Sequence, residues 1–146
     1  GMIEKGVEEG ARLIAGGPGR PEGMNRGYFI RPTVFADCNN DMNIMREEIF
    51  GQVLSMMPFD TEEEAVEIAN DTVYGLTNYV QTQDGTRANR LARALRSGMV
   101  EMNGSSRGAG APFGGMKQSG NGREGGLWGI EDFLEVKSVA GWTPDA

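Results

Sequence analysis

The sequence predicts an α/β protein in which helices flank a largely parallel sheet. Strand and helix patterns alternate between residues 53 and 103, the rhythm of consecutive βαβ units. The apolar run Val53–Phe59 is nearly continuous, which is typical of a strand that is buried on both faces. A third pattern is the alternating segment at 133–142, which predicts a final strand with one apolar face. Such a strand needs a sheet to join, either within the chain or in a partner.

Short elements separated by turn residues are expected in the N-terminal third. They are, in order, a helix that starts at Met2, an apolar strand at Arg12–Ala15, a loop at 18–27 and an extended segment at 28–37. Pro32 confines the extended segment to a sheet edge or divides it into two strands. One or two helical turns are predicted next, with Asp41 as the N-cap and Gly51 as the stop.

Two helices are the clearest local predictions. The first begins with a capping-box pattern, in which Thr61 is followed three residues later by Glu64. The second carries alanines and leucines at helical spacing, and Gly98 is expected to be its C-cap. Strands are predicted after each helix, at 75–82 and at 99–103. A glycine-rich segment then precedes a weak helix and the alternating segment.

Composition excludes several classes of protein. The 146 residues contain no histidine and one cysteine, Cys38, so no histidine-dependent triad and no internal disulfide can form within the chain. A single cysteine favours a reducing compartment, and we expect a cytoplasmic protein. The net charge of −7 argues against a nucleic-acid surface. No apolar run approaches the ~20 residues of a membrane span.

The segment GNGREG (120–125) matches the G-x-G-x-x-G fingerprint of dinucleotide-binding turns. That fingerprint requires a strand before the first glycine, a helix at the third, and an acidic residue about 20 residues later. Here GGMKQS precedes Gly120, and Gly126 and Gly129 weaken any helix that follows. Glycine makes up 23 of the 146 residues, which raises the chance of an accidental match. A structural glycine loop is therefore favoured over a phosphate site.

Other charged or reactive side chains favour structural roles. Four arginines recur every third residue on the second helix (Arg87, Arg90, Arg93 and Arg96), as on a solvated face opposite an apolar stripe. The acidic run in TEEEAVE suits a helix N-terminus better than a metal site. Cys38 lacks a histidine to activate it, so a passive thiol is expected. No catalytic residue and no metal ligand is assigned to this chain.

Six segments in order and spacing resemble one family, the NAD(P)-dependent aldehyde dehydrogenases. They are GYFIRPTVFAD (27–37), REEIFGQVLSMMPFD (46–60), EAVEIANDTVYGLTNYV (64–80), SGMVEMNG (97–104), PFGGMKQSGNGREGG (112–126) and LEVKSV (134–139). The resemblance extends from Met2 to Trp142, but members of the family are several times longer. It implies that residues 1–131 are the C-terminal part of the catalytic domain, and that 132–146 are an oligomerisation strand and tail.

The resemblance also implies three site residues. Glu48, the second glutamate of the E-E-I-F-G motif, is similar to the residue that binds the hydroxyls of the nicotinamide ribose. Phe50 matches the aromatic residue that packs near the nicotinamide, and Phe113 matches the substrate entrance, together with the loop 104–111. Gln52 departs from the family pattern, which usually has proline there. From sequence pattern alone, Glu48 could instead be a surface carboxylate on a capped turn.

The resemblance implies a full-length enzyme that oxidises an aldehyde to a carboxylic acid with NAD or NADP. The chain alone is expected to be inactive and not to bind the cofactor, because the nucleophile, the general base and the Rossmann-type domain have no counterpart in it. Exposed apolar surface and the final strand predict self-association. A non-catalytic assembly module is the alternative, and an independent nucleotide-binding domain based on GNGREG is a third interpretation.

Overall fold

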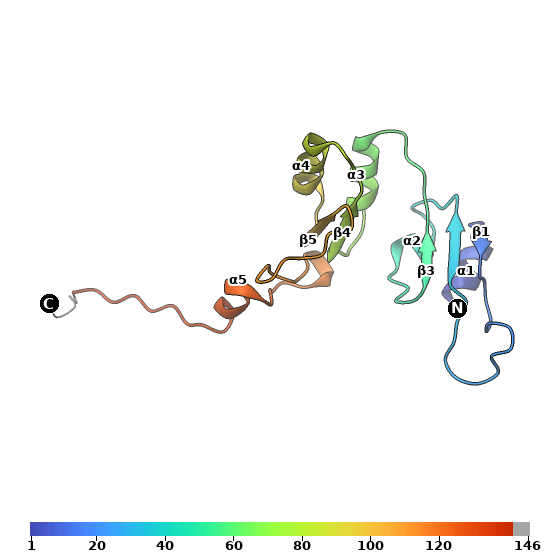
Figure 1. Ribbon diagram of the computed structural model, residues 1–146, viewed down its shortest axis with the longest axis horizontal. Coiled ribbons are helices and arrows are strands. Elements are labelled where there is room, and N and C mark those ends of the chain that lie inside the picture. Colours follow the sequence, from blue (N-terminus) through green and yellow to red (C-terminus); the bar gives the residue numbers. More distant parts are fainter. Residues whose placement is uncertain (142–146) are drawn as a thin grey trace. The chain divides into compact units, whose positions relative to one another are not determined.

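The computed structural model describes residues 1–141 and divides into two compact units, Gly1–Thr72 and Val73–Ala146 (Figure 1). Each unit contains helices and a small sheet of its own. Within the described residues, no helix is long and apolar enough to cross a membrane. The mixed α/β class with parallel strand pairs is the class that the sequence predicts.

The first unit is built on a three-stranded sheet in the order β1-β2-β3. Its strands are β1 (Arg12–Ala15), β2 (Thr33–Ala36) and β3 (Val53–Ser55). β1 runs antiparallel to β2, and β2 runs parallel to β3. The segment 28–37 forms one strand, β2, at the centre of the sheet, so neither the edge position nor the division into two strands expected from Pro32 is found. Pro32 directly precedes β2, so its missing N–H does not interrupt the strand.

The core of this unit surrounds Phe35, which has an exposed fraction of 0%. The helices α1 (Met2–Glu8) and α2 (Asn43–Arg46) contribute to the packing around it. Gly6 of α1 allows a close approach, because a Cβ atom there would lie 3.0 Å from Ile44 Cδ1 and 3.2 Å from Phe35 Cζ. The buried members of the core are Ala11, Phe35, Cys38, Met42 and Ile44.

The start of α2 differs from the prediction. Asp41 is not its N-cap; the N-cap is Met42, which has no capping side chain. The carboxylate of Glu9 instead accepts a hydrogen bond from the backbone N–H of Asn43 at 2.7 Å, and another from its side-chain amide. A residue 34 positions away thus satisfies the helix N-terminus, and local sequence patterns cannot reveal such a partner.

The helix α3 (Glu62–Asn70) begins as predicted. Thr61 is its N-cap, and its hydroxyl accepts a hydrogen bond from Glu64 N at 3.1 Å. The carboxylate of Glu64 in turn accepts a hydrogen bond from the backbone N–H of Asp60 at 2.7 Å. Asp60 lies one residue before the N-cap. The capping pattern is confirmed, with its reciprocal bond displaced by one residue.

The second unit contains a βαβ arrangement. β4 (Thr77–Val80) pairs in parallel with β5 (Met99–Met102), and α4 (Gly85–Ala94) connects them. The expected run of βαβ units from residue 53 is only partly formed, because β3 and β4 belong to different sheets. The alternating pattern identifies the type of each element, but ladder pairing depends on contacts between distant segments.

The helix α4 ends earlier than expected. Its C-cap is Leu95 rather than Gly98, and Gly98 lies at the entry to β5. The arginines of its exposed face and the half-buried Leu91 and Leu95 agree with the predicted amphipathic pattern. Arg93 donates to Asn89 on the same helix at 2.9 Å.

Titration of Asp84 is expected to weaken α4. Its carboxylate accepts hydrogen bonds from Thr86 N at 2.8 Å and Arg87 N at 3.1 Å. These two bonds lower the pKa of Asp84 below its ordinary value, and the bond from Arg87 has the larger effect. A lowered folded-state pKa means that the stabilisation is present above the unfolded pKa of about 4, and is lost as pH falls through the folded value.

Asp84→Ala should therefore reduce stability at pH 7, and the difference from the unchanged chain should shrink below about pH 4. Asp84→Asn keeps a capping oxygen and should reduce the pH dependence without removing the cap. Thermal unfolding of both variants, followed by circular dichroism between pH 3 and 7, measures their stability and its pH dependence. A difference between Asp84→Ala and the unchanged chain that stays constant over this range would contradict the assignment.

The glycine-rich segment leads to two short helices, η1 (Lys117–Ser119) and α5 (Gly126–Glu131). Residues 134–141 form no strand within the described chain, and Figure 1 draws them without a strand arrow. The alternation at 133–142 therefore stays a prediction about pairing with another sheet. Part of the expected oligomerisation tail, residues 142–146, lies outside the described residues.

Candidate functional site

Glu48 lies on the loop between α2 and β3. Glu47 before it is extended, with φ −105° and ψ 141°, and directs the chain away from the helix. Glu48 is exposed, and its carboxylate makes no hydrogen bond or ion pair within residues 1–141. Both carboxylate oxygens are therefore free to accept hydrogen bonds from two hydroxyls of one ligand.

Phe50 lies two residues further along the same loop. Its side chain is 91% exposed, and its φ of +53° falls in the left-handed region. That conformation is costly for a bulky residue, by roughly 1–2 kcal/mol. A large aromatic ring that is presented to solvent on a strained backbone is a typical feature of binding sites.

Both ends of this loop are attached to regular structure. At the N-terminal end, Arg46 Nη1 donates to the carbonyl oxygen and to the carboxylate of Asp71, at 2.7 and 2.6 Å. Hydrogen bonding and charge attraction from Asp71 raise the pKa of Arg46. At the other end, the carbonyl of Gln52 accepts from Thr33 N of β2 at 2.9 Å. The loop with Glu48 and Phe50 is thus held at α2 and at the sheet, although Gln52 replaces the usual proline.

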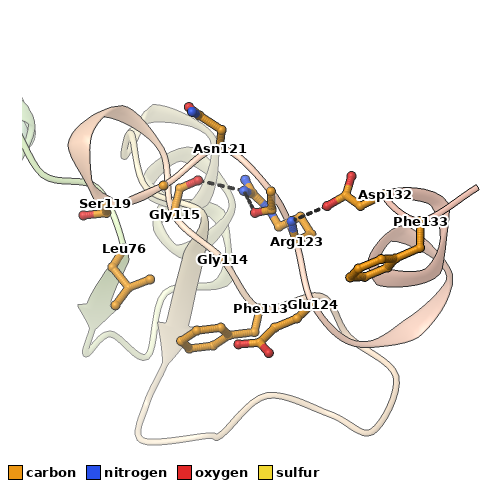
Figure 2. Close-up of a pocket in the computed structure, with 12 residues that line it drawn as sticks. Leu76, Phe113, Gly114, Gly115, Ser119, Asn121, Arg123, Glu124, Asp132 and Phe133 are labelled. Atoms are coloured by element: carbon orange, nitrogen blue, oxygen red, sulfur yellow. Dashed lines mark hydrogen bonds between the residues drawn. The ribbon is translucent and has the colours of Figure 1, made fainter.

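Phe113 lies in the second unit and is half-buried. It forms an isolated antiparallel bridge with Glu124, in which each backbone N–H donates to the other's carbonyl at 2.8 Å. Figure 2 shows Phe113 and Glu124 at facing positions of this bridge. They line a hollow of about 300 Å³, together with Leu76, Gly114, Gly115, Ser119, Gly120, Asn121, Gly122, Arg123, Asp132 and Phe133.

Arg123 fastens the GNGREG segment to neighbouring backbone and side-chain groups through three hydrogen bonds. Its guanidinium donates to the carbonyl of Gly115 at 2.7 Å, which is a dashed line in Figure 2, and to the carbonyl of Gly122 at 2.9 Å. Its backbone N–H donates to the carboxylate of Asp132 at 3.1 Å. No strand leads into Gly120, and α5 has 6 residues. A short helix does begin at the third glycine, but the strand that a dinucleotide turn requires before the first glycine is missing from the described residues, which agrees with a structural glycine loop.

Cys38 is 4% exposed and belongs to the core of the first unit. Burial raises the pKa of its thiol, which disfavours the nucleophilic thiolate. Its environment agrees with the passive role expected from the sequence. Among the described residues, no group of three or more potential metal ligands is clustered.

The three predicted site residues fall on two surfaces. Glu48 and Phe50 share a loop of the first unit, and Phe113 lies in the second unit. Sequence reasoning missed Arg107, whose guanidinium carbon lies 4.9 Å from the centroid of the Phe113 ring. The signal for it was its place as the only charged residue in the glycine-, serine- and alanine-rich loop 104–111.

Comparison with known proteins gives consistent matches over nearly the whole chain. The model of the aldehyde dehydrogenase family matches residues 1–139. A Staphylococcus saprophyticus protein that bears the name aldehyde dehydrogenase is 54% identical over 140 residues, which are 96% of this chain and 30% of that protein.

Solved structures show the same similarity. The aldehyde dehydrogenase of Bartonella henselae is 58% identical with a TM-score of 0.94, over 97% of this chain and 30% of that one. A mutant of aldehyde dehydrogenase C from Pseudomonas syringae, complexed with NAD⁺ and octanal, is 51% identical with a TM-score of 0.94, over 99% and 30% of the two chains. The chain thus spans about 30% of the length of the relatives it matches.

Proposed function

Because this chain belongs to the aldehyde dehydrogenase family, we propose that it forms part of the cofactor and substrate sites of a longer enzyme that oxidises an aldehyde to a carboxylic acid. The observation that carries the proposal is the loop on which Glu48 and Phe50 are exposed together, anchored at both ends. The relatives from Pseudomonas syringae and Mycobacterium tuberculosis were solved with NAD⁺.

The residues of this loop fit one end of a nicotinamide cofactor. The carboxylate of Glu48 has two oxygens available, which suits the two hydroxyls of a ribose. The Phe50 ring offers an apolar face on which a nicotinamide ring could rest. When bound, NAD(P)⁺ would accept a hydride, so that an aldehyde and water give a carboxylate, NAD(P)H and two protons. We assign these two residues to positioning and Phe113 to the aldehyde entrance.

The chain by itself is proposed to be inactive. Its one thiol, Cys38, is buried, and burial raises its pKa, so it offers no activated nucleophile. Incubating the pure chain with an aldehyde and NAD⁺ should produce no NADH. Turnover that is abolished by Cys38→Ser would refute this part of the proposal. The lone cysteine also agrees with a reducing compartment, and we propose the cytoplasm.

A chimera tests the positioning role of Glu48. This chain would replace the corresponding part of the Bartonella henselae enzyme, to which it is 58% identical. In an active chimera, Glu48→Gln should lower kcat/KM for NAD⁺ by about 10- to 100-fold, because it removes charge-assisted hydrogen bonds. Steady-state kinetics at varied NAD⁺ concentration give the value.

The neighbouring carboxylate provides the matched control. Glu47 is also exposed, and Glu47→Gln makes the same chemical change one residue away. It should alter kcat/KM for NAD⁺ by less than about threefold. Equal losses in the two variants would remove the specific role of Glu48. A chimera that folds but oxidises no aldehyde would refute the proposed function itself.

Assembly is a second candidate role, which the C-terminal segment favours. Its apolar residues are exposed, Val136 to 98%, and they are Phe133, Leu134, Val136 and Val139. An apolar, unpaired segment of this kind is suited to join the sheet of another subunit. Light scattering should give a larger mass for the whole chain than for a chain that lacks residues 132–146. An unchanged mass would count against this role.

A further inference from the structure

The guanidinium of Arg107 is placed over an aromatic ring at the expected substrate entrance. Its Cζ lies 4.9 Å from the centroid of the Phe113 ring, within the range of a cation–π interaction. The contact confines a long, exposed side chain to one region of the loop. The positive charge is therefore positioned beside Phe113.

Two backbone hydrogen bonds form local turns around Arg107. On its N-terminal side Ser105 N donates to Met102 O at 3.0 Å, and on its C-terminal side Ala111 N donates to Gly108 O at 3.1 Å. The loop sequence is GSSRGAGA, so Arg107 is its only charged and its only long side chain. The electrostatic character of this loop therefore depends on one residue.

Within the described residues, Arg107 lacks the polar partners that Arg12, Arg46 and Arg123 have. Arg12 and Arg46 form ion pairs with Asp37 and Asp71, and Arg123 donates to two backbone carbonyls. Within residues 1–141, Arg107 has no ion pair and no hydrogen bond of its guanidinium. Its N–H donors remain available, and their planar fork matches the geometry of a carboxylate.

We propose that the aldehyde oxidised at this site carries a carboxylate at its far end, and that Arg107 selects it. This inference rests on the proposed function, and on Phe113 as an entrance residue. The ring of Phe113 holds the guanidinium from one side, and the substrate carboxylate accepts two hydrogen bonds from the fork. Two carboxylates, of Glu124 and Asp132, line the hollow beside Phe113, and neither forms an ion pair with Arg107.

The test compares two aldehydes of equal length in the same chimera, one with a methyl end and one with a terminal carboxylate. The readout is the ratio of their kcat/KM values. The unchanged chimera should favour the carboxylated aldehyde by about tenfold or more, and Arg107→Gln should bring the ratio down by about the same factor. Arg107→Lys keeps the charge without the fork and should give an intermediate ratio.

Arg26→Gln is the matched control, because Arg26 is an exposed loop arginine of the other unit. It should leave the ratio unchanged, and circular dichroism should confirm that all variants are folded. If the chimera oxidises both aldehydes equally, or Arg107→Gln leaves the ratio intact, this inference is overturned while the proposed function stands. If the folded chimera oxidises neither aldehyde, the proposed function fails first.

Discussion

Replacing Phe35 by alanine should destabilise the first unit by about 3–5 kcal/mol, enough to unfold much of it. Phe35 is fully buried at the centre of a small core, and it belongs to the central strand of the sheet. The side chains packed around it, among them Met42 and Ile44, would have to shift to fill the cavity that the ring leaves. The change should also release the Glu48–Phe50 loop, which is anchored to β2 through Thr33.

Hydrogen exchange of the β2 amides measures this loss directly, and it does not require the two units to unfold together. Phe59→Ala is the control, since Phe59 is in the same unit and is 59% exposed. It should cost less than about 1 kcal/mol. Amide protection in β2 that survives Phe35→Ala, or falls equally in both variants, would show that Phe35 is not central to the core.

Gly98→Ala should destabilise the second unit by about 3 kcal/mol. A Cβ atom at this position would overlap the carbonyl oxygen of Gly114, and would lie 2.7 Å from its carbonyl carbon and 3.1 Å from Gly115 Cα. All of these are backbone atoms, so no side chain can move aside. The displacement would separate β5 from the segment that carries Phe113, and should therefore also reduce aldehyde oxidation in the chimera.

Gly85→Ala provides a control of the same chemical type. Nothing lies within 4 Å of a Cβ atom at Gly85, which is the first residue of α4. Alanine is the better helix former, so this variant should be unchanged or more stable, by up to about 1 kcal/mol. Urea unfolding monitored by circular dichroism compares the two. A Gly98→Ala variant that is as stable as Gly85→Ala would mean that the close backbone approach does not exist.

Local patterns predicted the elements whose partners lie close in sequence. Thr61 and Glu64 are three residues apart, and the predicted cap of α3 is present. The strand, helix and strand between residues 77 and 102 also follow the expected order. In contrast, the N-terminus of α2 is satisfied by Glu9, and Gly98 is a packing glycine instead of a helix cap. Both depend on atoms that the chain brings together only after folding.

The sequence by itself determined the class of fold and the family, and it supplied Glu48, Phe50 and Phe113 as proposed site residues, because capping patterns and family motifs consist of residues that are close together in the sequence. Tertiary structure alone decided how those residues are presented. The left-handed backbone of Phe50, the contact of Arg107 with the Phe113 ring and the division of the strands into two sheets are examples. Each results from packing and backbone geometry. Their energies depend on residues that are distant in the sequence, so no single short segment predicts them.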